Sequence, residues 1–302
     1  MSKKILIVGG TGFLGYHLAK FCLKRKWQVI SVSRKKPKKI RFLKRVKYIL
    51  FDISQKKLLK SKLKQHKSID YVVNFGGEVE HKKLKQTLLS HFSGSKNLAD
   101  FYLKSNIRKF IQIGSSLEYG DFKSPHRENL ILKPKSNYSR AKSLASKNLL
   151  KLYVKHNFPV IIFRPYQVFG PNQDLNRLIP IVISNCLKDK KFPCSEGKQY
   201  RDFLYIDDFI QAISKSFSFQ YSGEVFNIGY GKAYKIKEII EHIQKKIKLG
   251  KPQYGLIKLR KEENILTYPC IKKLKKYLNW EPKTKIFNGI NKTIKYYKRL
   301  SL

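Results

Sequence analysis

The amino-terminal stretch KKILIVGGTGFLGYHLAKFC constrains the fold more than any other part of the chain. A short apolar run, ILIV, leads into Gly9, Gly12 and Gly15, and Leu14 and Leu18 then recur at helical spacing. A strand that turns through closely spaced glycines into a helix brings backbone N–H groups and the positive end of the helix dipole to an anion. The stretch therefore predicts the first strand, turn and helix of a dinucleotide-binding fold. The contacts expected from this turn to a bound cofactor are those of Gly9, Gly12, Phe13, Leu14 and Gly15.

Strands and helices continue to alternate through the first half of the chain. Apolar runs such as VKYILFD, IDYVVNFGG, RKFIQIGSS and FPVIIFRPY are separated by stretches with helical periodicity, among them LLSHFSGSKNLADFYLKSN. Continuous apolar strands that alternate with helices are typical of a parallel sheet covered on both faces. We therefore expect an α/β fold built on a doubly wound parallel sheet of the Rossmann type.

The end of the second expected strand, in SVSRKKPKK, indicates which cofactor is preferred. A carboxylate at this place accepts hydrogen bonds from the ribose 2′-hydroxyl of NAD, whereas an arginine accommodates the 2′-phosphate of NADP. Ser33 and Arg34 stand here instead of an acid, which favours NADP(H). NAD(H) stays possible because lysine and arginine occur throughout this chain. Asp52 and Ile53, after the third strand, stand where a contact to the adenine is expected.

A tyrosine and a lysine one helical turn apart supply candidate acid–base chemistry. Tyr138 and Lys142 lie in SNYSRAK at positions i and i+4. A phenol loses its proton near pH ~10, and a neighbouring ammonium stabilises the phenolate, so that proton exchange with a substrate oxygen becomes feasible. Ser115, just after the strand in RKFIQIGSS, adds a hydroxyl that can hold the same oxygen. By itself, a Tyr-x-x-x-Lys pair in a lysine-rich chain is equally compatible with an exposed helix face.

The composition argues against several other classes of protein. The longest apolar runs are too short to span a bilayer, and the start of the chain reads as a strand rather than a signal peptide. The cysteines lack metal-ligand spacing, so we expect no metal, reduced thiols and a cytoplasmic protein. These cysteines are Cys22, Cys186, Cys194 and Cys270.

The chain is strongly basic, with 65 Lys and Arg against 20 Asp and Glu and a net charge of +45. The lysines are spread over separate segments rather than concentrated in a nucleic-acid-binding module, so no specific nucleic-acid partner is expected. One interpretation is simply a solvated basic surface. The other is peripheral contact with an anionic surface, such as a membrane or polymer, or attraction of an anionic substrate.

The order of the motifs resembles the extended short-chain dehydrogenases/reductases, the family of nucleotide-sugar epimerases, dehydratases and reductases. The motifs that carry the resemblance span nearly the whole chain and are GGTGFLG, Asp52, VVNFGG, SSLEYG, YSRAK, FRPYQVFGP, RLIP, GKQYRDFLYIDD, FNIGYG and LNWEPKT. The resemblance implies an NAD(P)-binding Rossmann domain over residues 1–165, to which 205–228 return. It also implies a smaller α/β, mainly substrate-binding domain over 166–302, with the active site in the cleft between the two domains.

The resemblance also assigns roles to individual residues. Tyr138 becomes the acid/base, Lys142 tunes it and holds the nicotinamide ribose, and Ser115 occupies the position of the family's catalytic hydroxyl. Arg201 matches the arginine that holds the diphosphate of a sugar nucleotide. The further cofactor contacts are those of Phe75, Gly76 and Gly77. The residues implied to bind the nucleotide-sugar substrate are Ser115, Gln167, Asn172 and Arg201, and a homodimer is expected.

The sequence departs from the family pattern at three places. Nucleotide-sugar 4,6-dehydratases carry Asp-Glu directly after the catalytic hydroxyl, but Ser116 and Leu117 follow Ser115 here, so elimination of water is not expected. Gln167 replaces the usual Asn of RxxNVYG, and His91 replaces the usual Asn that opens NxxGTxN. Both leave substrate detail open. We interpret His91 as a helix-face residue rather than a new catalytic base.

Two enzymatic hypotheses and one non-enzymatic hypothesis follow. The favoured one is NADPH-dependent reduction of the 4-keto group of a nucleotide-activated 4-keto-6-deoxyhexose, because GSSLEYG also resembles such reductases more than epimerases. The alternative is a nucleotide-sugar 4-epimerase, similar to UDP-glucose 4-epimerase, that holds NAD tightly. A non-catalytic nucleotide-binding scaffold is disfavoured because Ser115, Tyr138 and Lys142 are all present.

Overall fold

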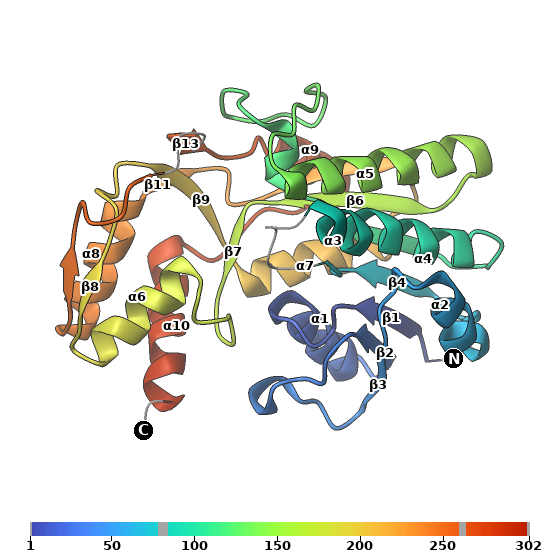
Figure 1. The fold of residues 1–302 in the computed structure, drawn as a ribbon, viewed down its shortest axis with the longest axis horizontal. Helices are drawn as coiled ribbons and strands as arrows, with labels where there is room; N and C mark the ends of the chain where they lie inside the picture. The colour runs from blue at the N-terminus through green and yellow to red at the C-terminus, as the bar shows by residue number, and fades with distance from the viewer. Residues whose placement is uncertain (1, 78–83, 260–263, 301–302) are drawn as a thin grey trace. The chain divides into compact units, whose positions relative to one another are not determined.

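The computed structural model of the chain describes residues 2–77, 84–259 and 264–300, which fold into two compact units (Figure 1). The first unit is assembled from three separate stretches of chain, Met1–Gly120, Glu128–Pro165 and Ile210–Asn227. The second consists of Asp121–Arg127, Tyr166–Phe209 and Ile228–Leu302. The chain therefore leaves the first unit and later returns to it.

A seven-stranded sheet forms the centre of the first unit. Its strands, in spatial order, are β10 (Glu224–Ile228), β6 (Val160–Pro165), β5 (Lys109–Ile113), β4 (Tyr71–Asn74), β1 (Lys4–Val8), β2 (Gln28–Ser33) and β3 (Val46–Leu50). All pairs from β6 to β3 are parallel. β4 and β5 are buried along their whole length, which explains why their sequences are predominantly apolar rather than alternating. The predicted α/β fold with a Rossmann-type, mostly parallel sheet is confirmed.

The strand order changes direction between β1 and β4. From β1 the sheet continues to β2 and β3 on one side, while β4, β5 and β6 follow on the other. In open parallel sheets, ligands bind outside the carboxyl ends of the strands at such a switch point. The order therefore places the loops after β1 and β4 where a dinucleotide is expected, with the ends of β2, β3 and β5 beside them.

Helices cover both faces of this sheet. They are α1 (Phe13–Lys24), α2 (Lys56–Leu63), α3 (Leu84–Leu88), α4 (Gly94–Tyr102), α5 (Asn137–His156) and α7 (Ile206–Ser216). A π-helical turn, Leu89–Ser93, joins α3 to α4. Short 3-10 turns follow β2 at Lys39–Arg41, α2 at Lys64–His66 and β5 at Ser116–Tyr119.

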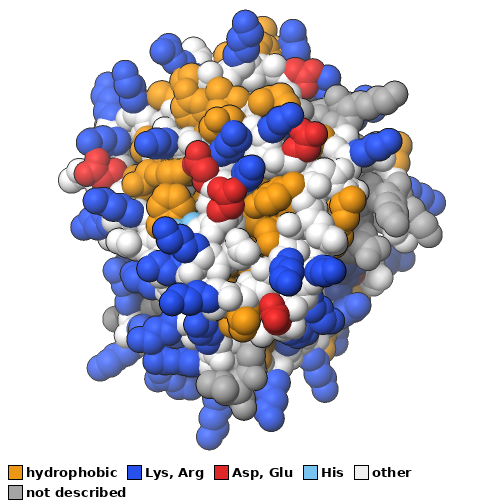
Figure 2. Space-filling view, turned by 90° about the vertical axis from the view of Figure 1, so that its left-hand side faces the viewer, with side chains coloured by type: hydrophobic (Ala, Val, Ile, Leu, Met, Phe, Trp, Pro, Cys, Tyr) orange, Lys and Arg blue, Asp and Glu red, His pale blue; other side chains and the backbone are white. Residues whose placement is uncertain are grey.

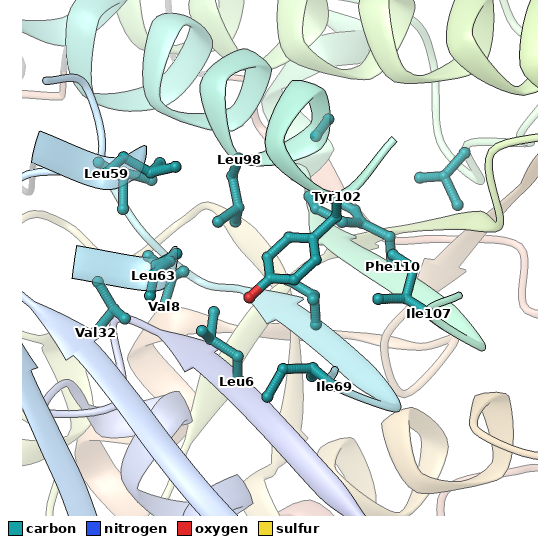
Figure 3. Close-up of a cluster of buried hydrophobic side chains, with 14 of the residues drawn as sticks. Leu6, Val8, Val32, Leu59, Leu63, Ile69, Leu98, Tyr102, Ile107 and Phe110 are labelled. Atoms are coloured by element: carbon teal, nitrogen blue, oxygen red, sulfur yellow. The ribbon is translucent and has the colours of Figure 1, made fainter. Parts of the chain in front are cut away.

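The core of the first unit covers both faces of the sheet at β1. Leu6 and Val8 pack into a buried apolar cluster with residues of α2, α4 and α5, including Leu98 (Figure 3). Ile5 and Ile7 alternate with them and point to the opposite face. They are also fully buried, because α1 contacts β1 and β2 on that side. The sheet therefore has no solvent-exposed face at its centre.

Ser31 on β2 is a buried polar side chain for which the structure offers no partner. It is fully buried, and among the described residues none forms a hydrogen bond with its Oγ atom. A buried hydroxyl without a partner is destabilising, so Ser31→Ala is expected to raise the free energy of unfolding by about 1 kcal/mol. The matched control is Ser95→Ala, because the equally buried Ser95 Oγ donates to Gln112 Oε1 at 2.9 Å. Urea unfolding measures both variants, and equal losses of stability would contradict the prediction.

The second unit contains a small mixed sheet and the carboxyl-terminal helices. Its strands are β7 (Gln167–Phe169), β9 (Tyr200–Tyr205), β11 (Ala233–Lys235) and β13 (Leu266–Thr267), with β8 (Lys191–Pro193) and β12 (Lys251–Gln253) paired separately. Its helices are α6 (Leu178–Leu187), α8 (Ile236–Ile247), α9 (Lys272–Leu278) and α10 (Ile286–Leu300). Asp202 on β9 holds the turn before β11, because its carboxylate accepts the backbone N–H groups of Tyr230, Gly231 and Lys232 at 2.8, 2.6 and 3.1 Å.

Candidate active site

The loop after β1 forms a tight turn that has no room for side chains. Gly9 has a φ of +76°, a conformation that favours glycine, and its N–H donates to Val32 O at 2.8 Å. The N–H of Gly12 donates back to Gly9 O at 3.0 Å. A Cβ at Gly15 would lie 2.3 Å from Gly9 O and 2.6 Å from Gly10 Cα. The loop backbone packs this closely against α1 only because these positions are glycine.

The amino-terminal end of α1 fits the pyrophosphate of a dinucleotide. Gly12 is the N-cap residue, no side chain caps the helix, and its first turn contains no acidic residue. No side chain among the described residues therefore accepts hydrogen bonds from the first backbone N–H groups of the helix, and no carboxylate of the first turn neutralises the positive end of the helix dipole. Phe13 and Leu14, the first helical residues, are half-buried. This is the anion-binding arrangement that the glycine motif predicts.

The carboxyl ends of β2 and β3 carry the residues expected near the adenosine. Ser33 is buried, and its Oγ accepts the N–H of Thr11 in the glycine loop at 3.4 Å. Arg34, the next residue, is exposed. Asp52 is half-buried after β3, whereas the Ile53 side chain belongs to the apolar core. An exposed guanidinium, rather than a carboxylate, thus follows β2.

The loop after β4 lies directly against the glycine loop. The N–H of Phe75 donates to Val8 O at 3.0 Å, and a Cβ on Gly9 would lie 3.2 Å from the carbonyl carbon of Phe75. Gly76 donates its N–H to Asn74 Oδ1 at 2.9 Å. Gly77 is exposed and has a φ of +147°. The structure therefore brings the two predicted glycine-containing loops together at the switch point of the sheet.

Tyr138 and Lys142 lie one turn apart near the start of α5, which begins after a Ser136 cap. The Lys142 side chain is buried; its Nζ donates to Ile113 O at 2.7 Å and lies 5.8 Å from the centre of the Tyr138 ring. Burial lowers the pKa of Lys142 to about 8, an effect that the carboxylate of Glu118 opposes. A buried cation beside a phenol is an arrangement that stabilises the phenolate.

Ser115 follows β5 and caps the short helical turn after it. Its Oγ accepts the N–H of Leu117 at 3.2 Å, and its own N–H donates to Glu118 Oε1 at 2.8 Å. Because Oγ acts as an acceptor within the turn, its hydroxyl hydrogen is directed to a different partner. Lys142 bonds to the carbonyl of Ile113, two residues before Ser115. We call Ser115, Tyr138 and Lys142 the candidate triad.

A histidine outside the expected site faces Tyr138. His91 is buried in the π-helical turn, and its ring meets the Tyr138 ring edge-on with 4.9 Å between their centres. A Cβ on Gly77 would overlap the His91 ring, so glycine at this position makes room for it. His91 is a helix residue, as interpreted from the sequence, but its contact with Tyr138 was not predicted. π-Helical turns are frequent at functional sites.

A buried ion pair lies next to the candidate triad and was also missed. Arg164 Nε lies 3.2 Å from Glu118 Oε2, and the two side chains are 4% and 0% exposed. The sequence contained two signals of this pair. Arg164 lies inside the apolar strand VIIFRP, and Glu118 is one of only 20 acidic residues in the chain. Neither signal identifies its partner.

The residues expected to bind the nucleotide end of the substrate lie in the second unit. Gln167 is exposed on β7, opposite Phe203 of the parallel strand β9. Arg201 precedes Phe203 by two residues, so it lies on the same face of the small sheet as Gln167. Its Nη1 donates to two backbone carbonyl oxygens at 2.8 and 3.3 Å. Asn172 is buried and accepts the hydroxyl of Tyr296 on α10. Substrate binding by these residues stays a prediction.

The described parts of the chain contain neither a metal-binding cluster nor a membrane-spanning helix. No group of three His, Cys, Asp or Glu side chains there is arranged to hold a metal ion. Within residues 2–77, 84–259 and 264–300, no helix is both long and apolar enough to cross a membrane. The cysteines are free thiols. Burial raises the pKa of Cys22 to about 12, which keeps this thiol protonated and unreactive.

One face of the molecule carries basic side chains over most of its extent. On the face shown in Figure 2, Lys and Arg side chains spread from one end to the other, with isolated Asp and Glu among them. Peripheral contact with an anionic surface stays a prediction.

Comparison with known proteins identifies the family. Residues 5–229 match the model of the NAD dependent epimerase/dehydratase family. The dTDP-D-glucose 4,6-dehydratase of Mus musculus is 25% identical over 99% of this chain and 89% of its own. The UDP-glucose 4-epimerase of Thermotoga maritima, solved with UDP-glucose, has a TM-score of 0.93 at 22% identity and covers 99% of both chains. The UDP-glucuronic acid 4-epimerase of Bacillus cereus, solved with UDP-glucuronic acid and NAD, has a TM-score of 0.87 at 25% identity over 98% of this chain and 99% of its own.

The family match includes the glycine loop and the candidate triad. It confirms the resemblance found in the sequence and the prediction that the protein is an enzyme. The named relatives include a dehydratase and two epimerases, so the comparison defines the type of chemistry but not one reaction. The chain belongs to the NAD dependent epimerase/dehydratase family and is an enzyme of the extended short-chain dehydrogenase/reductase type.

Proposed function

We propose that the protein uses NADPH to reduce the 4-keto group of a nucleotide-activated 4-keto-6-deoxyhexose. The named relatives act on nucleotide sugars, which supports this substrate class. The observation that carries the choice of a reductase is the end of β2, where buried Ser33 and exposed Arg34 stand in place of a carboxylate. A site that accommodates the 2′-phosphate suits a reductase, because each cycle consumes one NADPH.

Each member of the candidate triad has a defined task in this reaction. A bound nicotinamide supplies the hydride that becomes attached to C4. Tyr138 donates its phenolic proton to the C4 oxygen, so that the carbonyl becomes a hydroxyl, and solvent then returns a proton to the phenolate. The hydroxyl of Ser115 donates a hydrogen bond to the same oxygen, as its acceptor role toward Leu117 allows. The ammonium of Lys142 stabilises the phenolate.

The second unit is proposed to hold the nucleotide end of the substrate. Arg201 carries the charge that matches a diphosphate, and Gln167 lies on the same face of its sheet. Asn172 completes the proposed set. Elimination of water is not part of the proposal, because Ser116 and Leu117 follow Ser115, and the Leu117 side chain is apolar and 54% exposed. Neither supplies the carboxyl group that such an elimination needs.

The first test identifies the cofactor that the purified protein carries. The protein is denatured, any released nucleotide is identified, and the refilled apo-protein is titrated with NADPH and NADH. Tighter binding of NADPH, followed by its oxidation in the presence of dTDP-4-keto-6-deoxyglucose, would support the reductase. Stoichiometric, tightly held NAD would contradict it.

Arg34→Ala is expected to weaken NADPH binding about 10- to 100-fold and to leave NADH binding nearly unchanged. The reason is the loss of a hydrogen bond between charged groups at the 2′-phosphate, which NADH lacks. Fluorescence titration with both nucleotides measures the effect. Lys36→Ala, which removes another exposed cation of the same loop, is the matched control. Equal effects of Arg34→Ala on the two nucleotides would show that Arg34 does not recognise the phosphate.

A 4-epimerase is the second candidate. It is supported by the 25% identity, over 98% of this chain, to the Bacillus cereus UDP-glucuronic acid 4-epimerase solved with NAD. The candidate triad serves this reaction too, with Tyr138 first removing and then returning the proton at the C4 oxygen. Incubation with UDP-glucuronic acid, without added nucleotide, distinguishes the candidates: formation of the 4-epimer with no net change in NAD(P)H would favour the epimerase.

A further inference from the structure

The ion pair of Glu118 and Arg164 lies inside the first unit of a chain in which acidic residues are scarce. Both side chains are almost completely inaccessible to solvent. Removing two charges from water is costly, and a buried ion pair is weak evidence for added stability. Stability alone therefore does not explain this pair, since two apolar side chains of similar size would serve it as well. We look for a role that requires the charges.

One carboxylate oxygen of Glu118 fixes the backbone at Ser115. Oε1 accepts the Ser115 N–H at 2.8 Å, while Oε2 faces Arg164 Nε at 3.2 Å. A Cβ on Gly114 would lie 2.4 Å from Oε1, so the glycine before Ser115 leaves the space in which the carboxylate sits. Ser115 Oγ is itself held by the N–H of Leu117. The direction of the Ser115 hydroxyl therefore depends on the position of Glu118.

Arg164 connects the same turn to the neighbouring strands of the sheet. From β6, its Nη1 donates to the hydroxyl of Tyr119 at 3.0 Å, and its guanidinium lies 4.9 Å from the centre of the Tyr119 ring. The Tyr119 hydroxyl donates in turn to Asn227 Oδ1 on β10 at 2.7 Å. The turn after β5 is thus anchored to both strands that follow β5 in the sheet.

Glu118 also supplies a negative charge to Lys142. The Lys142 ammonium is buried and donates to Ile113 O at 2.7 Å. The Glu118 carboxylate is the charge that opposes the loss of its proton. Among the described residues, further ionisable groups near this ammonium or its partners are Tyr138 on the same helix, His91, which faces Tyr138, and Arg164, which contacts Glu118.

We propose that Glu118 and Arg164 form a positioning pair that aims the Ser115 hydroxyl in the carbonyl-reducing site, an inference that rests on the proposed function. Neither residue touches the reacting atoms. Glu118 acts on Ser115 through the backbone N–H and on Lys142 through its charge. Arg164 holds the Glu118 carboxylate in place. Without that carboxylate, Arg164 would be a buried cation that lacks its anionic partner.

The test compares Glu118→Gln with the wild-type enzyme in NADPH-dependent reduction of dTDP-4-keto-6-deoxyglucose. The substitution keeps the size of the side chain and an oxygen for the Ser115 N–H, but it removes the charge. We expect kcat to fall about 10- to 100-fold with little change in KM, and the alkaline limb of the kcat profile to move to lower pH. Wild-type kcat and an unmoved alkaline limb in folded Glu118→Gln would overturn the proposal.

Two further variants separate positioning from stability. Glu118→Gln combined with Arg164→Met removes both charges together, which is tolerated better than one unpaired charge, and it is expected to show the same loss of kcat. Lys109→Met removes another buried cation, bonded to Tyr221 O and Ser222 Oγ at the amino end of β5. It is expected to lower the unfolding temperature without changing kcat or the pH profile. A loss of kcat in Lys109→Met equal to that in Glu118→Gln would overturn the proposal.

Tyr138→Phe separates failure of this inference from failure of the proposed function. If Tyr138→Phe is inactive and Glu118→Gln is unaffected, only the positioning role is wrong. If Tyr138→Phe turns over at the wild-type rate, the proposed function itself is wrong, and the positioning role falls with it.

Discussion

Tyr138→Phe is expected to lower kcat for reduction of dTDP-4-keto-6-deoxyglucose by about 10²- to 10⁴-fold. The substitution removes the proton donor proposed for the C4 oxygen and keeps the aromatic ring. The ring is retained in its edge-on contact with His91, 4.9 Å between centres, so the local packing is preserved. NADPH affinity is expected to stay close to that of the wild type.

The matched control is Tyr153→Phe, which makes the same change on the same helix, where Tyr153 packs against Gly223 rather than the candidate triad. Steady-state oxidation of NADPH gives kcat, and quenching of protein fluorescence by NADPH gives the affinity. A Tyr138→Phe enzyme with wild-type kcat would exclude Tyr138 as the acid. A loss of kcat shared equally by Tyr153→Phe would indicate a general effect of the substitution.

Lys142→Met is expected to remove most of the activity and yet to make the protein more stable at pH 7. Activity falls because the phenolate of Tyr138 loses its neighbouring cation. Stability rises by on the order of 2 kcal/mol, because replacing a buried ammonium with an apolar side chain outweighs the loss of the hydrogen bond to Ile113 O and of the attraction to the Glu118 carboxylate. Such opposite effects on activity and stability are common at functional sites.

The lowered pKa of Lys142 also makes stability and activity depend on pH. The pKa of Lys142 is about 8 in the folded protein against an ordinary value of 10.5, so between these values the unfolded chain binds more protons. The free energy of unfolding of the wild type therefore gains a contribution that rises from about pH 8 to 10.5. Wild-type activity is expected to fall over the start of this range, as the ammonium deprotonates.

Urea unfolding at several pH values, with kcat measured in parallel, checks both halves of this prediction. Lys142→Met is expected to lack the rise in stability. Lys147→Met, which changes an exposed lysine of the same helix, is expected to behave like the wild type in both measurements. A Lys142→Met protein that is less stable than the wild type at pH 7 would show that the buried ammonium is not a destabilising element.

The parts of the fold that could be predicted are those that local sequence determines. The first strand, the glycine turn and the first helix follow from an apolar run, the spacing of Gly9, Gly12 and Gly15, and a helical period. The closeness of Tyr138 to Lys142 follows from their i, i+4 spacing alone. The alternation of strands and helices then leads to a parallel sheet, and the carboxyl ends of its strands lie at one edge.

The parts that could not be predicted depend on pairs of residues far apart in the chain. Glu118 and Arg164 are 46 residues apart, and no local pattern connects them. The contact between His91 and Tyr138 likewise joins a π-helical turn to a helix that is distant in sequence. The short strands of the second unit, such as β7 and β13, contain too few residues to show a period.

The order in which the first unit obtains its strands has a consequence for synthesis on the ribosome. β6 (Val160–Pro165) is paired on one side by β5, but its other neighbour, β10 (Glu224–Ile228), comes from a much later part of the chain. Until β10 has emerged, the nascent chain presents the apolar run VIIF as an open strand edge, the kind of template that pairs with other chains. The late return of residues 210–227 thus makes completion of the first unit dependent on the synthesis of all residues up to Asn227. A message truncated after the codon for Pro165 would encode an aggregation-prone fragment rather than a smaller working domain.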